Sequence, residues 1–88
     1  MPLNLKLYQY HIEQMMREKN LKGVAMMNYL FAQYVNGWMS KEYIVEFRQS
    51  LFEAMNYFNS FGLPEEIDKD RQIMWNYARA ARSFEECL

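Results

Sequence analysis

The chain has 88 residues, of which 51% are hydrophobic, 17% aromatic and 24% charged. The length suits one domain over residues 1–88, and the high hydrophobic fraction excludes a disordered chain. Ten Lys and Arg against eleven Asp and Glu give a formal net charge of −1, so no overall field attracts nucleic acid or an anionic membrane. A single Cys excludes an internal disulfide, and a single His leaves too few ligands for a Cys/His metal site.

The first segment is ambiguous between strand and helix. Leucines alternate as in a strand from residue 3 to residue 7, whereas apolar residues recur at helical spacing from Leu5 to Met16. Two charge pairs four residues apart favour helix, namely Glu13 with Arg17 and Glu18 with Lys22. A lone strand would also need a partner chain to pair with. We predict a helix over residues 4–20, ended by Asn20 and Gly23.

The second segment carries no charge. Between Gly23 and Ser40 there is no Asp, Glu, Lys, Arg or His. A membrane-spanning helix needs ~20 predominantly apolar residues, and here amide side chains and a glycine interrupt a shorter run. We therefore predict a deeply buried helix over residues 24–36 of a water-soluble bundle. Asn36 and Gly37 would close this helix, because both tolerate positive φ. The competing interpretation is a β-hairpin turn at Asn36-Gly37, but the flanking residues do not alternate between apolar and polar as strands do.

The third segment begins with a clear capping signal. Ser40 is a good N-cap, and Glu42 in the first turn complements the positive end of the helix dipole. The apolar residues then follow a heptad, at positions Ile44, Phe47, Leu51, Ala54, Phe58 and Phe61. We predict a helix over residues 41–61, closed by Gly62 and followed by Pro64 at the first turn of the next helix.

The fourth segment repeats the same periodicity, and we predict a helix over residues 64–86. Its apolar positions are Ile67, Met74, Tyr77, Ala81, Phe84 and Leu88. The small residues Ala78, Ala80 and Ala81 allow a neighbouring helix to approach closely. Four helices with short connections predict an all-α, antiparallel bundle. An alternative keeps the second helix as a separate element that forms a dimer.

The sequence does not suggest an enzyme. Nothing in the spacing brings Cys87 and His11 together as nucleophile and base, and no Glu stands three residues before His11 as in a carboxylate metal site. The three glycines are isolated, so no phosphate-binding loop is present. The acidic cluster at the start of the last predicted helix is explained by the helix dipole and needs no cation; its members are Glu65, Glu66, Asp68 and Asp70. We expect no catalytic residues, no cofactor and no metal.

The termini carry no recognised targeting signal. The first residues lack the basic and apolar regions of a secretory signal, and Cys87 is next to last rather than fourth from the end as prenylation requires. We therefore expect a cytoplasmic protein.

One candidate surface is a stripe on the last helix at spacings of 4, 4 and 3, formed by Arg71, Trp75, Arg79 and Arg82. Arg and Trp are typical of protein-binding hot spots, and Trp75 between two arginines suits cation–π stacking. The same set could hold phosphate and stack on a base. Acidic residues at both ends of the stripe disfavour that role. A third interpretation is a solvated face whose arginine stems cover an aromatic edge.

A second candidate surface follows from a surplus of large side chains. Eight Met and fifteen Phe, Trp or Tyr exceed what a small four-helix core can hold. We expect several to remain on or near the surface, namely Tyr29, Tyr34, Trp38, Met39 and Tyr43. Trp38 and Met39 lie at a helix junction, which is normally polar. The competing interpretation is that Tyr and Met fill an irregular core.

Together these patterns predict a small non-enzymatic protein that binds another protein by steric docking, as an inhibitor, neutraliser or adaptor, and that forms a homodimer. The predicted partner-binding residues are Tyr34, Trp38, Met39, Tyr43, Arg71, Trp75, Arg79 and Arg82. The alternative is a helical nucleic-acid-binding regulator with Arg71, Arg79 and Arg82 on phosphates.

Overall fold

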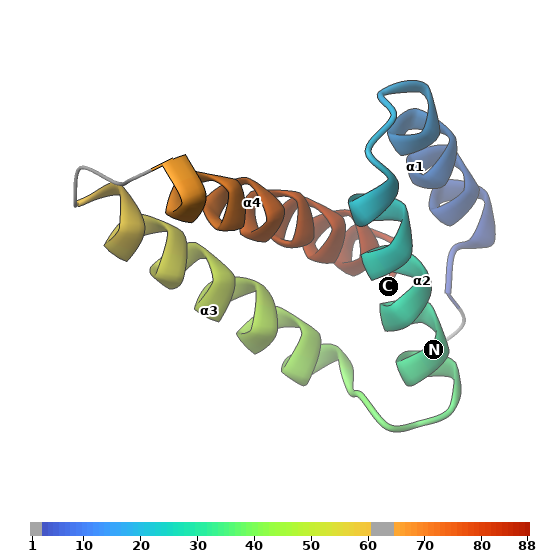
Figure 1. Ribbon diagram of the computed structural model, residues 1–88. Helices are drawn as coiled ribbons and strands as arrows, with labels where there is room; N and C mark the ends of the chain where they lie inside the picture. The colour runs from blue at the N-terminus through green and yellow to red at the C-terminus, as the bar shows by residue number, and fades with distance from the viewer. Residues whose placement is uncertain (1–2, 61–64) are drawn as a thin grey trace.

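The computed structural model describes residues 3–60 and 65–88, and its regular elements are all helices (Figure 1). In chain order they are α1 (Leu5–Arg17), α2 (Leu21–Val35), α3 (Lys41–Asn59) and α4 (Glu65–Glu86). The all-α prediction is confirmed, and the ambiguous first segment is helical from Leu5.

Helix α4 is the centre of the bundle and contacts each of the other three helices. In Figure 1, α3 and α4 lie side by side and antiparallel, forming a long hairpin. The second hairpin, α1 with α2, crosses the C-terminal half of α4. The molecule is elongated, with extents of 43 × 29 × 17 Å.

Two of the predicted helix boundaries are confirmed, one by a capping hydrogen bond and one by its backbone conformation. The Oγ of Ser40 accepts a hydrogen bond from the backbone N–H of Tyr43 at 3.2 Å, as an N-cap should. Gly37 follows α2 with φ of +74°, a conformation that favours glycine. The predicted stop at Gly62 and restart at Pro64 lie outside the described residues.

The predicted end of the first helix is wrong. Helix α1 ends at Arg17, and Lys19 takes up the left-handed conformation, with φ of +58°. Asn20 begins the next helix instead, because its Oδ1 accepts a hydrogen bond from the Gly23 backbone N–H at 2.9 Å. A Cβ on Gly23 would lie 2.7 Å from the Asn20 Nδ2, so glycine makes room for this cap. The proposed pairing of Glu18 with Lys22 also fails, since the two are not in one helix.

The core lies where α1, α2 and the start of α3 meet the C-terminal half of α4. Its fully buried members are Met15, Met27, Leu30, Ile44, Ala80, Ala81, Phe84 and Cys87. Phe84 is the largest of them, and its ring stands edge-on to Tyr8 and Tyr34 at centroid distances of 6.2 and 5.9 Å. The buried alanines let α4 approach its neighbours closely, as their size predicts.

Helix α2 is less buried than its uncharged sequence suggests. Only its inner face is buried, through Gly23, Met27 and Leu30, whereas Leu21 and Val35 are exposed on the other side. The expectation of a deeply buried helix is therefore wrong: α1 and α4 cover one side of α2, and its other side remains exposed in the described part of the chain. Within residues 3–60 and 65–88, no helix combines the length and apolar content needed to cross a membrane.

Candidate functional site

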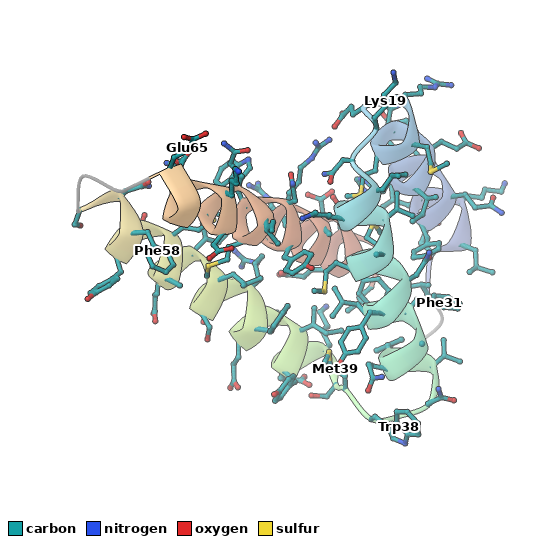
Figure 2. The ribbon with its side chains drawn as sticks, in the orientation of Figure 1. Lys19, Phe31, Trp38, Met39, Phe58 and Glu65 are labelled. Atoms are coloured by element: carbon teal, nitrogen blue, oxygen red, sulfur yellow. The ribbon has the colours of Figure 1, made fainter. Side chains whose placement is uncertain are left out.

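The turn between α2 and α3 has a hydrogen-bonded backbone and an exposed tryptophan side chain. The backbone N–H groups of Trp38 and Met39 both donate to the carbonyl of Gln33, at 2.9 and 3.3 Å. The Trp38 side chain is nevertheless 74% exposed, and Figure 2 shows it at the tip of the turn, directed away from the helices. A rigid backbone that carries an exposed indole is a preorganised contact point, because little order must be gained on binding.

The residues predicted around Trp38 divide into exposed and supporting ones. Tyr43, in the first turn of α3, is exposed like Trp38. Met39 and Tyr34 are half-buried and pack against the core, where the Tyr34 ring meets Phe84. We call Trp38, Met39 and Tyr43 the Trp38 patch, with Tyr34 as its support. Tyr29 is also exposed, but it lies farther back, in the middle of α2.

Each arginine of the predicted stripe already has a carboxylate partner. Arg71 Nη2 lies 2.7 Å from Asp68 Oδ1, and Arg82 Nε lies 3.7 Å from Glu86 Oε1. Arg79, the third arginine of the stripe, pairs with Glu18.

The Arg79 pair is the best formed of the three. Its guanidinium donates to both carboxylate oxygens of Glu18, and the Nη2–Oε1 distance is 2.8 Å. These hydrogen bonds lower the pKa of Glu18 below its usual value and raise the pKa of Arg79. The contact ties the middle of α4 to the turn after α1. We infer that Arg79 has a structural role here, which its place on the exposed stripe did not indicate.

Trp75 does not stack between arginines as predicted. Its ring instead meets Phe52 of α3 edge-on, with centroids 6.2 Å apart, and Arg48 rather than a stripe arginine lies over the Phe52 ring, 5.8 Å from its centroid. Trp75 packs on the α3 side because contact with the apolar Phe52 ring removes part of the indole from water. The indole remains half exposed.

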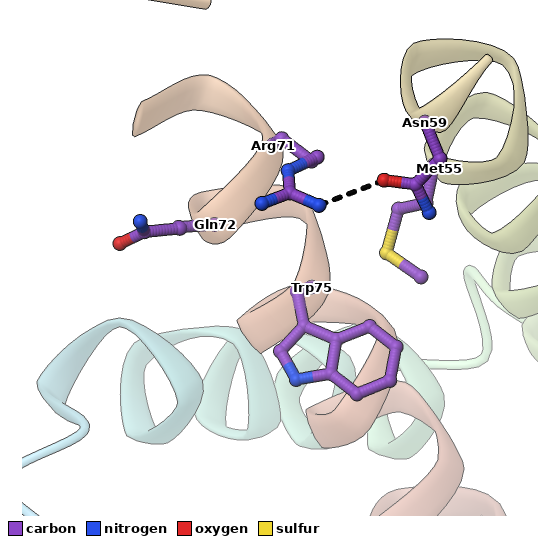
Figure 3. Close-up of a pocket in the computed structure, with 5 residues that line it drawn as sticks. All are labelled: Met55, Asn59, Arg71, Gln72 and Trp75. Atoms are coloured by element: carbon purple, nitrogen blue, oxygen red, sulfur yellow. Dashed lines mark hydrogen bonds between the residues drawn. The ribbon is translucent and has the colours of Figure 1, made fainter. Parts of the chain in front are cut away.

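A groove between α3 and α4 lies beside Trp75 and was not predicted from the sequence. It encloses about 320 Å³ and is lined by Met55, Asn59, Arg71, Gln72 and Trp75 (Figure 3). The Arg71 Nη1 donates to the Asn59 Oδ1 across it, at 2.7 Å. Because Arg71 is hydrogen-bonded to Asn59 and ion-paired with Asp68, the groove presents apolar surface and amides rather than an unpaired charge.

The two predicted surfaces lie at different ends of α3. Trp38 precedes the first residue of this helix, whereas Arg71 contacts Asn59, its last residue. A helix of 19 residues is about 28 Å long. The Trp38 patch and the Arg71–Trp75 end of the stripe therefore do not form one continuous site.

The two groups with potential for chemistry lie near the end of α4. His11 Nε2 is 3.3 Å from Glu86 Oε2 but lacks hydrogen-bond geometry. The buried Cys87 thiol donates to the Ser83 carbonyl at 3.3 Å, and burial, followed by the charge of Glu86, raises the pKa of Cys87 to about 11. In the described residues, no three His, Cys, Asp or Glu side chains gather as metal ligands. A neutral, buried thiol is a poor nucleophile.

Cys87 gives a test of this packing. A thiol-specific reagent at neutral pH should label the native chain slowly and the urea-unfolded chain at once, because only unfolding exposes the thiol. The thiol's pKa rises on folding from 9.0 to about 11, so the unfolded chain deprotonates first. The free energy of unfolding should therefore fall as the pH rises through this interval. The Cys87→Ala variant should show a weaker fall, and rapid labelling of the native chain would contradict the buried position.

Comparison with known proteins adds no assignment: no family model, no curated protein and no solved structure matches this chain.

Proposed function

We propose that this chain is a cytoplasmic, non-enzymatic protein-binding module that self-associates and acts by docking on a partner protein through the Trp38 patch. The observation that carries the proposal is the Trp38 indole, 74% exposed on a turn whose backbone is hydrogen-bonded to Gln33. In water this indole has no compensating contact, whereas in an interface it can bury ~150–250 Å².

The surroundings of Trp38 support a protein partner over a charged ligand. Residues 23–40 carry no charge, so Trp38 and Met39 lie in an uncharged stretch, and the opposite charges of Lys41 and Glu42 separate them from Tyr43. Tryptophan and tyrosine are enriched among the few residues that dominate interface energies. Docking there would act sterically: the chain covers a surface of its partner, and inhibition or bridging follows from which surface is covered.

The nucleic-acid alternative receives less support from the arginine contacts. Arg71, Arg79 and Arg82 would each have to leave a carboxylate before neutralising a phosphate. The remaining acids would repel the backbone of a nucleic acid.

The two functions can be separated with the immobilised full chain and a native cell extract. The proposal expects a retained protein that survives nuclease treatment and a rise in salt, because apolar contacts depend little on ionic strength. Retention that disappears with nuclease, together with a low-salt gel shift of DNA or RNA whose log affinity falls steeply with log salt, would favour the alternative.

A further inference from the structure

The outer face of α2 is a largely apolar surface that the described helices leave exposed. Its residues follow spacings of 4, 3, 4 and 3, the seam of a helix that pairs with another helix. The seam residues, with one flanking tyrosine, are Leu21, Ala25, Asn28, Tyr29, Ala32 and Val35, and all of them are exposed. Leu21 and Val35, at its two ends, are 64% and 60% exposed. We call this surface the α2 outer face.

We propose that a second copy of this chain covers the α2 outer face, so that two α2 helices pack antiparallel in a homodimer. This inference rests on the self-association in the proposed function and assigns it a surface. A helix that is apolar on all sides normally lies inside a structure. Here α1 and α4 cover the inner side of α2, and the same uncharged sequence continues around the outer side.

The chain exposes more surface than a compact monomer of its mass. Its accessible surface is 6101 Å². A compact monomer of 10.8 kDa exposes about 5,500 Å². The excess of about 600 Å² reflects the elongated shape of the chain, 43 × 29 × 17 Å, which leaves the outer side of α2 exposed.

The charges favour a second copy in antiparallel orientation. An uncharged face can meet itself across a two-fold axis without opposing like charges. Lys22 lies in the first turn of α2, and no basic residue lies in the last turn. Parallel helices would place Lys22 beside the partner's Lys22, whereas antiparallel helices place it near the partner's helix C-terminus, whose carbonyls carry partial negative charge. The groove beside Trp75 is less suitable, since charged residues 68–71 flank it.

Asn28 lies at the midpoint of the seam, where a two-fold axis would pass. Its Oδ1 accepts a hydrogen bond from the Tyr8 hydroxyl at 2.5 Å, so α1 holds this amide in place. A polar residue within an apolar seam fixes the register of paired helices. With Asn28 at the axis, the Nδ2 group that does not bond to Tyr8 meets the partner's amide, whereas any other register places it against apolar side chains.

The test uses two tyrosines of nearly equal exposure, Tyr29 on the α2 outer face (51%) and Tyr10 on α1 (53%). Sedimentation of the full chain at tens of micromolar should show twice the 10.8-kDa mass. Tyr29→Glu should weaken the dimer by about 100-fold or more, because it opposes like charges near the axis. Tyr10→Glu should leave the dimer unchanged, and an equimolar mixture of Tyr29→Glu and Tyr29→Lys should restore it. Circular dichroism checks that each variant folds, and Ala32→Glu is a second variant on the same face.

The outcomes separate this inference from the proposed function. A dimer that persists in Tyr29→Glu and Ala32→Glu would overturn the α2 interface and leave self-association in place. A wild-type chain that sediments only as a monomer would overturn both, while docking through Trp38 would still be tested separately.

A cross-linking experiment tests the orientation of the two helices. In an antiparallel dimer, oxidation should join Leu21→Cys to Val35→Cys when the two variants are mixed. Self-linking of each variant alone would indicate parallel helices and refute the proposed geometry.

Discussion

Replacing Phe84 with alanine is expected to lower the free energy of unfolding by about 3–5 kcal/mol. The ring is fully buried at the point where α1, α2 and α4 meet, and both Tyr8 and Tyr34 stand edge-on to it. Its removal leaves a cavity that three helices line and that none can fill without moving. A domain of this length has a total stability of about 4–13 kcal/mol, so the loss is a large fraction of the whole.

Urea unfolding followed by circular dichroism measures this effect. Phe84→Leu should cost much less, because it keeps most of the buried volume, and the exposed Met16→Ala should change stability by less than about 0.5 kcal/mol. A loss below about 1 kcal/mol in Phe84→Ala would contradict the position of this ring at the centre of the core.

The helices could be predicted because their signals are local. The heptad spacing from Ile44 to Phe58 and the cap at Ser40 lie within one stretch of chain, and the helix and its cap are both confirmed. The junction between α1 and α2 failed because Asn20 can end one helix or begin the next. Its side chain bonds forward to Gly23, and only the packed structure decides between these roles.

The surface predictions succeeded where exposure alone was needed. The surplus of large side chains indicated exposed ones, and Tyr29, Trp38 and Tyr43 are exposed. The other two predicted residues, Tyr34 and Met39, are half-buried against the core. The contacts of the stripe could not be predicted, because Arg79 meets Glu18 across 61 positions of sequence. The groove beside Trp75 also depends on which residues of α3 face α4, and the sequence gives no direct signal for that pairing.

The second large effect is expected on binding. Trp38→Ala should weaken the affinity for the partner protein by about 30-fold or more, since a buried indole at an interface contributes at least ~2 kcal/mol. The helical circular dichroism and the stability should remain close to wild type, because the side chain makes little contact with its own chain. Trp38→Phe should recover part of the affinity, since it keeps an aromatic anchor.

Isothermal titration of the captured partner with wild type, Trp38→Ala and Tyr57→Ala tests docking through the Trp38 patch most directly. Tyr57 is a suitable control because it is exposed near the far end of α3, away from the Trp38 patch. The proposed function predicts that Trp38→Ala loses most of the affinity while Tyr57→Ala binds like wild type. Equal affinities of wild type and a folded Trp38→Ala would contradict it.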